Sequence, residues 1–255
     1  MNFKLTIKYD GSNFSGWQVQ PNQRTVQNEI EVAIREIFQI KDLKLYGSGR
    51  TDSGVHAIGQ AANFLIKSTD METTQILNAI NSKISRDIYI LDCEEVDENF
   101  NSRFSAKSRE YIYKISKKYS PFSRKYSWYQ NYNLNIKKLE KCSKVLLGEH
   151  DFSNFCKSTS LKNKNLCNIT KSSWNFSNDK IFFEIKSNRF LHHMVRMLVG
   201  TMIEVSKDRI SEENFYDMIY NIKMDKKVVT APSLGLYLYK AVSYTHLTLP
   251  TTPYV

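Results

Sequence analysis

The chain has 255 residues, of which 41% are hydrophobic and 24% are charged. This composition excludes a mainly disordered chain, and the length allows a core large enough to need no disulfide or metal staple. Lysine and arginine number 36 against 26 aspartates and glutamates, a formal net charge of +10. Such a basic excess favours a polyanionic partner such as nucleic acid, although a lysine-rich solvated surface gives the same number.

The cysteines and the N-terminal residues point to a reducing compartment. No two cysteines form a Cys-x-x-Cys pair and no histidine stands beside them at zinc-finger spacing, so we expect free, buried thiols. The chain begins with an alternating strand pattern instead of a signal peptide, and no apolar run is long enough to cross a bilayer. We therefore expect a cytoplasmic protein.

The first hundred residues predict strands that alternate with helices. Residues 3–9 place apolar side chains at every second position, which indicates a strand with one buried face. Thr25 is the expected N-cap of a helix that runs to about Phe38 and carries an apolar stripe at helical spacing. After a glycine-rich segment, the pattern predicts a strand near 61–66, a helix near 72–81 and a strand over 88–96.

The second part of the chain repeats the alternation. Residues 177–179, Ser-Asn-Asp, form the turn of a predicted hairpin. The predicted elements are strands over 111–115, 169–176, 181–186 and 236–242, and helices over 136–147, 190–205 and 215–222. Short turns between adjacent strands, with helices interleaved, predict an α+β fold with antiparallel or mixed sheets.

These elements divide the chain into two α/β halves. We assign residues 1–103 to an N-terminal half and residues 104–242 to a C-terminal half. Residues 243–255 carry no charge and no periodic pattern, and they are rich in threonine and proline. We expect this last segment to be a non-native tail.

Residues 47–59 contain four of the nine glycines in the chain. Gly49 and Gly54 have the spacing of a phosphate-binding loop, but the lysine that this loop requires is missing after Gly54. A dinucleotide-binding fingerprint fails as well, because Asp52 stands where its third glycine belongs. What remains is a carboxylate in a tight loop, which is either a functional group or an ordinary turn aspartate that caps local amides.

Residues 49–57, Gly-Arg-Thr-Asp-Ser-Gly-Val-His-Ala, resemble the signature loop of the tRNA pseudouridine synthase A (TruA) family. The aspartate of that loop is the family's nucleophile. Met197 departs from the pattern, since the family often has asparagine there. The resemblance covers nearly the whole chain, through residues 8–11, 14–21, 24–27, 104–106, 109–113, 190–196 and 231–238.

This resemblance implies a pseudouridine synthase fold, in which two α/β halves with mixed, largely antiparallel sheets flank a basic cleft. It implies an isomerase that converts uridine to pseudouridine at positions 38, 39 and 40 of the tRNA anticodon stem-loop, and that acts as a homodimer without a cofactor.

The resemblance also assigns site residues. It implies that Asp52 is the nucleophile and that Arg196 pairs with it. Tyr111 corresponds to the tyrosine that contacts the substrate base; Tyr113 lies on the same strand face, so only the resemblance selects Tyr111. Further substrate contacts are expected from Arg50, which can hold a phosphate, and from His56 and Leu236.

These residue types suit the reaction. Pseudouridine formation breaks the bond between C1′ of ribose and N1 of uracil and rejoins the base through C5, which requires no redox step. An ionised carboxylate can attack either C1′ or C6, and the sequence leaves both open. A guanidinium beside a buried carboxylate favours its charged form. With its planar fork, Arg196 is expected to grip Asp52 through two hydrogen bonds.

Two other functions are compatible with some of these features. One is an RNA-binding protein without catalysis, against which the presence of Asp52, Tyr111 and Arg196 counts. The other is a metal-dependent hydrolase that uses Asp52 and His56. A metal site at His192-His193 is not expected, because adjacent residues on the predicted helix point about 100° apart.

Overall fold

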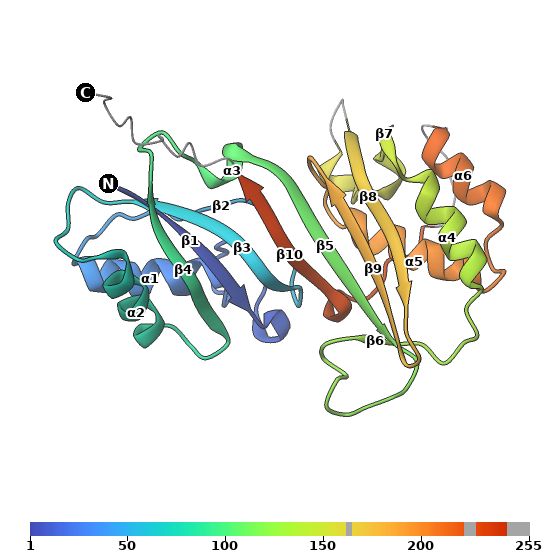
Figure 1. Cartoon of the computed structure of the whole chain (residues 1–255), viewed down its shortest axis with the longest axis horizontal. Helices are drawn as coiled ribbons and strands as arrows, with labels where there is room; N and C mark the ends of the chain where they lie inside the picture. The colour runs from blue at the N-terminus through green and yellow to red at the C-terminus, as the bar shows by residue number, and fades with distance from the viewer. Residues whose placement is uncertain (162–164, 222–227, 244–255) are drawn as a thin grey trace, which may run out of the picture.

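The computed structural model describes residues 1–161, 165–221 and 228–243. Its strands form one sheet in the order β4-β1-β3-β10-β5-β9-β8-β7, and the short β2 and β6 pair with β3 and β5 (Figure 1). The strands are β1 (Asn2–Tyr9), β2 (Tyr46–Gly47), β3 (His56–Leu65), β4 (Ile88–Val96), β5 (Ala106–Ser116), β6 (Trp128–Tyr129), β7 (Gly148–Asp151), β8 (Leu166–Phe176), β9 (Lys180–Ser187) and β10 (Leu236–Ser243).

Apart from the short α3, the α-helices lie in two groups, α1 and α2 beside the N-terminal strands and α4, α5 and α6 beside β7, β8 and β9 (Figure 1). They are α1 (Val26–Phe38), α2 (Thr73–Lys83), α3 (Ser102–Ser105), α4 (Ile136–Val145), α5 (Met194–Ser206) and α6 (Glu212–Tyr220). This arrangement confirms the predicted α+β fold.

Strand β10 joins the two halves of the molecule. It pairs in parallel with β3, where Tyr237 lies opposite His56, and antiparallel with β5, where Leu236 lies opposite Tyr113. The other neighbours along the sheet order are antiparallel, so the sheet is mixed and largely antiparallel, as predicted. The last strand of the sequence therefore sits in the middle of the sheet and brings loops of both halves together.

Several elements agree with the periodicity of the sequence. Helix α1 begins after Thr25, and its predicted stripe is buried at Val26, Ile30, Ala33 and Ile34. Strand β4 has the predicted bounds, and the hairpin of β8 and β9 turns at the predicted residues. Strand β1 buries the predicted apolar face, which consists of Phe3, Leu5, Ile7 and Tyr9.

Other bounds were predicted wrongly. Strand β3 begins at His56, five residues before the predicted start, because the glycine-rich segment turns directly into the sheet. Helix α5 begins at Met194 and not at Phe190, because His193 adopts a left-handed conformation. Ser243, the first residue of the expected tail, belongs to β10. The rest of that tail and Ile222, the predicted end of a helix, lie outside the described residues.

The structure bears on the expected state of the cysteines and on the search for membrane-spanning segments. All four cysteines are buried and free. Among the described residues, no helix is both long enough and apolar enough to cross a membrane.

Gly200 in α5 gives a test of this packing. A Cβ atom there would lie 2.2 Å from the carbonyl oxygen of Val229 and 2.8 Å from the amide nitrogen of Ala231, both backbone atoms. Alanine favours a helix interior by about 1 kcal/mol over glycine, but overpacking costs about 1–3 kcal/mol. We expect the clash to dominate, so that Gly200→Ala lowers the free energy of unfolding measured by urea titration.

Asn78→Ala on the exposed face of α2 is the matched control, because it adds helix propensity without a clash. We expect it to be neutral or slightly stabilising. If Gly200→Ala stabilised the protein as much as Asn78→Ala, the close approach of α5 to residues 229–231 would be refuted.

Candidate active site

Asp52 lies on the loop that joins β2 to β3. The loop turns sharply, with the amide of Val55 donating to the carbonyl of Asp52 at 3.1 Å. Gly54 has a φ of +75°, and a Cβ there would lie 2.6 Å from Ser233 Oγ. This position therefore requires glycine both for its backbone conformation and for the close approach of the segment before β10.

Hydrogen bonds to β1 and to the segment after it, which contains Phe14 and Trp17, hold the loop in place. The amide of Trp17 donates to the carbonyl of Thr51 at 3.1 Å, and the amide of Gly54 donates to the carbonyl of Phe14 at 3.2 Å. The hydroxyls of Tyr9 and Thr51 are hydrogen-bonded at 2.8 Å. The fold thus sets the position of the Asp52 side chain.

Arg196 of α5 approaches Asp52 from the other half of the chain. Its Nη1 donates to Asp52 Oδ2 at 3.1 Å, and the two side chains are only 16% and 20% exposed. Its Nε donates to the carbonyl of Ala231 at 2.9 Å. The prediction of two hydrogen bonds between Arg196 and Asp52 is therefore wrong. One guanidinium nitrogen, Nη1, donates to the carboxylate, and Nε donates to the backbone before β10.

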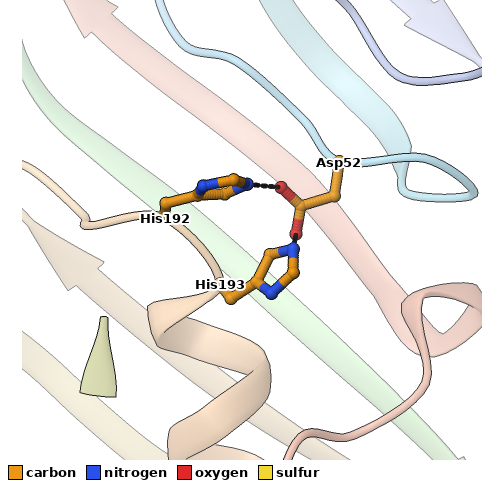
Figure 2. Close-up of side chains that lie close together, drawn as sticks. All are labelled: Asp52, His192 and His193. Atoms are coloured by element: carbon orange, nitrogen blue, oxygen red, sulfur yellow. Dashed lines mark ion pairs between the residues drawn. The ribbon is translucent and has the colours of Figure 1, made fainter. Parts of the chain in front are cut away.

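His192 and His193 also converge on Asp52 (Figure 2). His192 Nε2 lies 3.4 Å from Oδ1, and His193 Nε2 lies 3.4 Å from Oδ2. His193 has a φ of +65° and precedes the first residue of α5. The prediction of no metal site at these two histidines rests on adjacent helical residues pointing apart, and that premise is wrong, since neither residue lies within the helix.

The environment of the two imidazoles differs. Burial lowers the pKa of His193, the charge of Asp52 opposes this shift, and Arg196 adds to it. His193 is thus favoured in its neutral form. His192 is 40% exposed, and its Nδ1 lies 2.9 Å from Ser160 Oγ, which orients the ring.

Tyr111, on β5, lies near the loop, because a Cβ at Gly49 would be 4.0 Å from its hydroxyl. It is 8% exposed, and its ring meets that of Phe190 edge to face at 5.1 Å. Burial raises the pKa of Tyr111, and the charge of Asp52 raises it further, so the phenol is protonated at neutral pH. Tyr113, on the same strand, is fully buried and donates to the carbonyl of Pro232 at 2.8 Å, which is a role in the core.

His56 lies in the interior and is 2% exposed. Its Nδ1 accepts from the amide of Gly11 at 3.1 Å, so Nε2 carries the proton and faces the carbonyls of Lys125 and Leu234 at 3.1 and 3.2 Å. Nδ1 also lies 3.1 Å from Asp10 Oδ1. This placement fits a residue that fixes the start of β3 to its surroundings and not one that touches a substrate.

The two remaining residues predicted to contact the substrate, Arg50 and Leu236, differ in solvent exposure. Arg50 is exposed beside Asp52, whereas Leu236 is 5% exposed at the start of β10. Sequence reasoning missed Arg109, whose Nε and Nη2 donate to the carbonyl of Ser48 at 3.1 and 2.6 Å. No sequence spacing indicates that contact, because the loop and β5 meet only through the sheet.

Comparison with known proteins gives consistent matches. A family model described as tRNA pseudouridine synthase matches residues 5–105 and 143–244. The tRNA pseudouridine synthase A of Brachyspira hyodysenteriae is 39% identical over 243 residues, covering 94% of this chain and 97% of that protein. The enzyme of the same name from Caldicellulosiruptor saccharolyticus is 40% identical over 243 residues, covering 94% and 99%.

Among solved structures, the archaeal box H/ACA sRNP Nop10-Cbf5 complex matches 79% of this chain and 43% of that chain. The TM-score is 0.36 and the identity is 9%, a likeness too weak to inform the fold or the function.

The burial of His56 predicts a pH dependence of stability. Burial lowers the pKa of His56, an effect that the charge of Asp10 partly opposes. The folded state therefore favours the neutral ring, so this contribution is complete above the unfolded pKa of about 6.5 and is lost as the pH falls below it. We expect the melting temperature to fall between pH 7.5 and 5.5, and to fall less in His56→Gln.

The quantity to compare is the slope of the melting temperature against pH, because the substitution also changes stability at neutral pH. His150→Gln, at a histidine remote from this loop, serves as the control and should keep the wild-type slope. Equal slopes for the wild type and His56→Gln would show that His56 does not titrate with folding in this range.

Proposed function

This chain belongs to the tRNA pseudouridine synthase A family, and from that premise we propose that Asp52 is its catalytic nucleophile. The family membership makes the protein an isomerase that forms pseudouridine in tRNA. The observation that supports the role of Asp52 most directly is the convergence on its carboxylate of Arg196, His192 and His193.

The reaction needs a nucleophile and a place for one proton. Attack of a carboxylate oxygen on C1′ displaces uracil through N1, whereas attack on C6 leaves the base covalently held as the glycosidic bond breaks. In both routes C5 replaces N1 as the partner of C1′, C5 loses its hydrogen as a proton and N1 ends protonated. No atom is gained or lost, and the carboxylate is regenerated.

We assign Arg196 the role of holding Asp52 charged and aimed. The ion pair is about four-fifths shielded from solvent, where a lone carboxylate would be disfavoured. Because Nε of Arg196 is engaged with the carbonyl of Ala231, the guanidinium cannot rotate freely.

We assign Tyr111 a place against the substrate base. As a protonated phenol it can donate a hydrogen bond or relay a proton near C5, but it is not an available phenolate at neutral pH. Arg50, exposed beside Asp52, is suited to a phosphate of the displaced nucleotide. The target nucleotide must leave its stack to reach a carboxylate in this position.

The target positions, the oligomeric state and the division into two halves are proposed from the resemblance to the family, and the localisation is proposed from the sequence. We propose that the substrates are uridines 38, 39 and 40 of the anticodon stem-loop, that the enzyme is a cytoplasmic homodimer and that its two halves, residues 1–103 and 104–242, flank a basic cleft. The net charge of +10 supports a polyanionic substrate.

A hydrolase that uses Asp52 and His56 is less well supported. His56 is engaged with backbone groups and Asp10, and in the described part of the chain the histidines paired with Asp52 are His192 and His193. The proposed function is tested by incubating the purified protein with unmodified tRNA and mapping pseudouridine by carbodiimide treatment and primer extension. Absence of pseudouridine from the tRNA would refute it, and modification only outside positions 38–40 would refute the proposed specificity.

Asp52→Asn should abolish turnover while tRNA affinity stays near that of the wild type, because the amide keeps the shape of the side chain but is not a nucleophile. Single-turnover rates and filter binding measure the two quantities. Asp42→Asn, at an exposed aspartate, is the control for a loss of one negative charge. Residual turnover of Asp52→Asn near the wild-type rate would show that another group attacks.

Arg196→Lys should fold and bind tRNA but react about 10²-fold more slowly, because lysine cannot hold both Asp52 and the carbonyl of Ala231 in the same geometry. Arg196→Ala should be slower still, since it leaves the carboxylate without its countercharge. Arg86→Lys, at an exposed arginine, controls for the exchange itself. Wild-type rates in Arg196→Lys would exclude a positioning role.

A further inference from the structure

Asp52, His192 and His193 bring three atoms that can bind a metal close together. One oxygen or nitrogen atom from each side chain lies within 4.8 Å of the others. The left-handed conformation of His193 creates this arrangement, because it turns two adjacent imidazoles toward the same carboxylate (Figure 2).

The separations are close to those around a small tetrahedral ion. Bonds of about 2.0–2.1 Å at tetrahedral angles place neighbouring ligand atoms about 3.4 Å apart. His192 Nε2 lies 3.4 Å from Asp52 Oδ1 and His193 Nε2 lies 3.4 Å from the other carboxylate oxygen, Oδ2. One histidine therefore already has the tetrahedral separation from a given oxygen, and the other has to approach from within 4.8 Å. The side chains of His192 and His193 are 40% and 24% exposed, so an ion can enter and the rings can adjust around it.

The chemistry of the donors selects the ion. Two imidazoles and one carboxylate suit Zn²⁺, whereas Mg²⁺ prefers oxygen ligands and retains its water. Ser160 Oγ lies 2.9 Å from Nδ1 of His192, a second contact of the kind that orients ligating imidazoles and leaves Nε2 directed at the metal.

We propose that Asp52, His192 and His193 form a Zn²⁺ site with its fourth position open to water, and that zinc bound there inhibits the enzyme. The inhibition rests on the proposed function of Asp52, since a carboxylate that ligates zinc cannot attack the substrate. The nearby charge of Arg196, 3.1 Å from Asp52 Oδ2, opposes a cation. The ion is therefore exchangeable and not a permanent part of the fold.

Binding is tested without RNA, by calorimetric titration of zinc chloride into the full chain. We expect one site in the wild type and at least tenfold weaker binding in His192→Gln and in His193→Asn. Asparagine is chosen at position 193 because it tolerates a positive φ. His150→Gln removes a histidine outside the cluster and should bind zinc as the wild type does. Unchanged binding in both cluster variants would overturn the site.

A second measurement needs no variant. Cobalt(II) in a four-coordinate site absorbs strongly in the visible range, whereas six-coordinate cobalt(II) absorbs weakly. We expect the wild-type protein to give the strong spectrum on addition of cobalt chloride and to lose it on addition of zinc. A weak, six-coordinate spectrum would overturn the tetrahedral site even if the variants failed to fold.

Inhibition is measured with single-turnover rates on tRNA. Zinc mixed with the wild-type enzyme should lower the rate at least tenfold, EDTA should restore it and Mg²⁺ at the same concentration should have no such effect. If zinc bound without lowering the rate, the inhibitory role would be overturned. If the enzyme were inactive without zinc and with EDTA, the proposed function would fail while the calorimetric result would still decide the site.

Discussion

The ion pair between Asp52 and Arg196 is the contact on which the site depends. It joins residues 144 positions apart at 3.1 Å, one from each half of the chain. Neither charge is fully solvated, and a buried charge is costly unless it is paired. Docking of α5 against the loop after β2 therefore completes the site and pairs the two charges in the same step that buries them.

Strand β10 and the segment before it hold the Asp52–Arg196 ion pair in place. The amide of Ala231 donates to the carbonyl of Arg196 at 3.0 Å, and Nε of Arg196 donates to the carbonyl of Ala231 at 2.9 Å. From there the chain continues into β10, which pairs with β3 at the end of the Asp52 loop and with β5 beside Tyr111. Asp52, Arg196 and Tyr111 are thus connected through β10 and the segment before it. Of these three partners of Asp52, His192 is the most exposed, at 40% against 24% for His193 and 16% for Arg196.

Local patterns account for much of this structure. The alternation in β1 and the stripe of α1 are direct consequences of burying one face. The residue types of the loop at 49–57 leave the role of Asp52 open, and only the resemblance to the family's signature loop singles it out. Reasoning from periodicity failed at His193, where the apolar pattern of α5 continues upstream without a break although the backbone turns left-handed. It also could not place β10 between β3 and β5, because strand order depends on contacts far apart in the sequence. The single hydrogen bond from Arg196 to Asp52 reflects a competing backbone carbonyl that no spacing reveals.

The most direct test of the central claim is to identify the residue that becomes covalently attached to the substrate. A tRNA with 5-fluorouridine at its target positions blocks the last step, because fluorine, unlike hydrogen, cannot leave C5 as a cation. In the route through C6 the carboxylate is still bonded to the base at that step, and the adduct is trapped. After incubation, nuclease and protease digestion followed by mass spectrometry should find the modified nucleotide on the peptide that contains Asp52. An adduct on a different peptide, with the Asp52 peptide unmodified, would contradict the account.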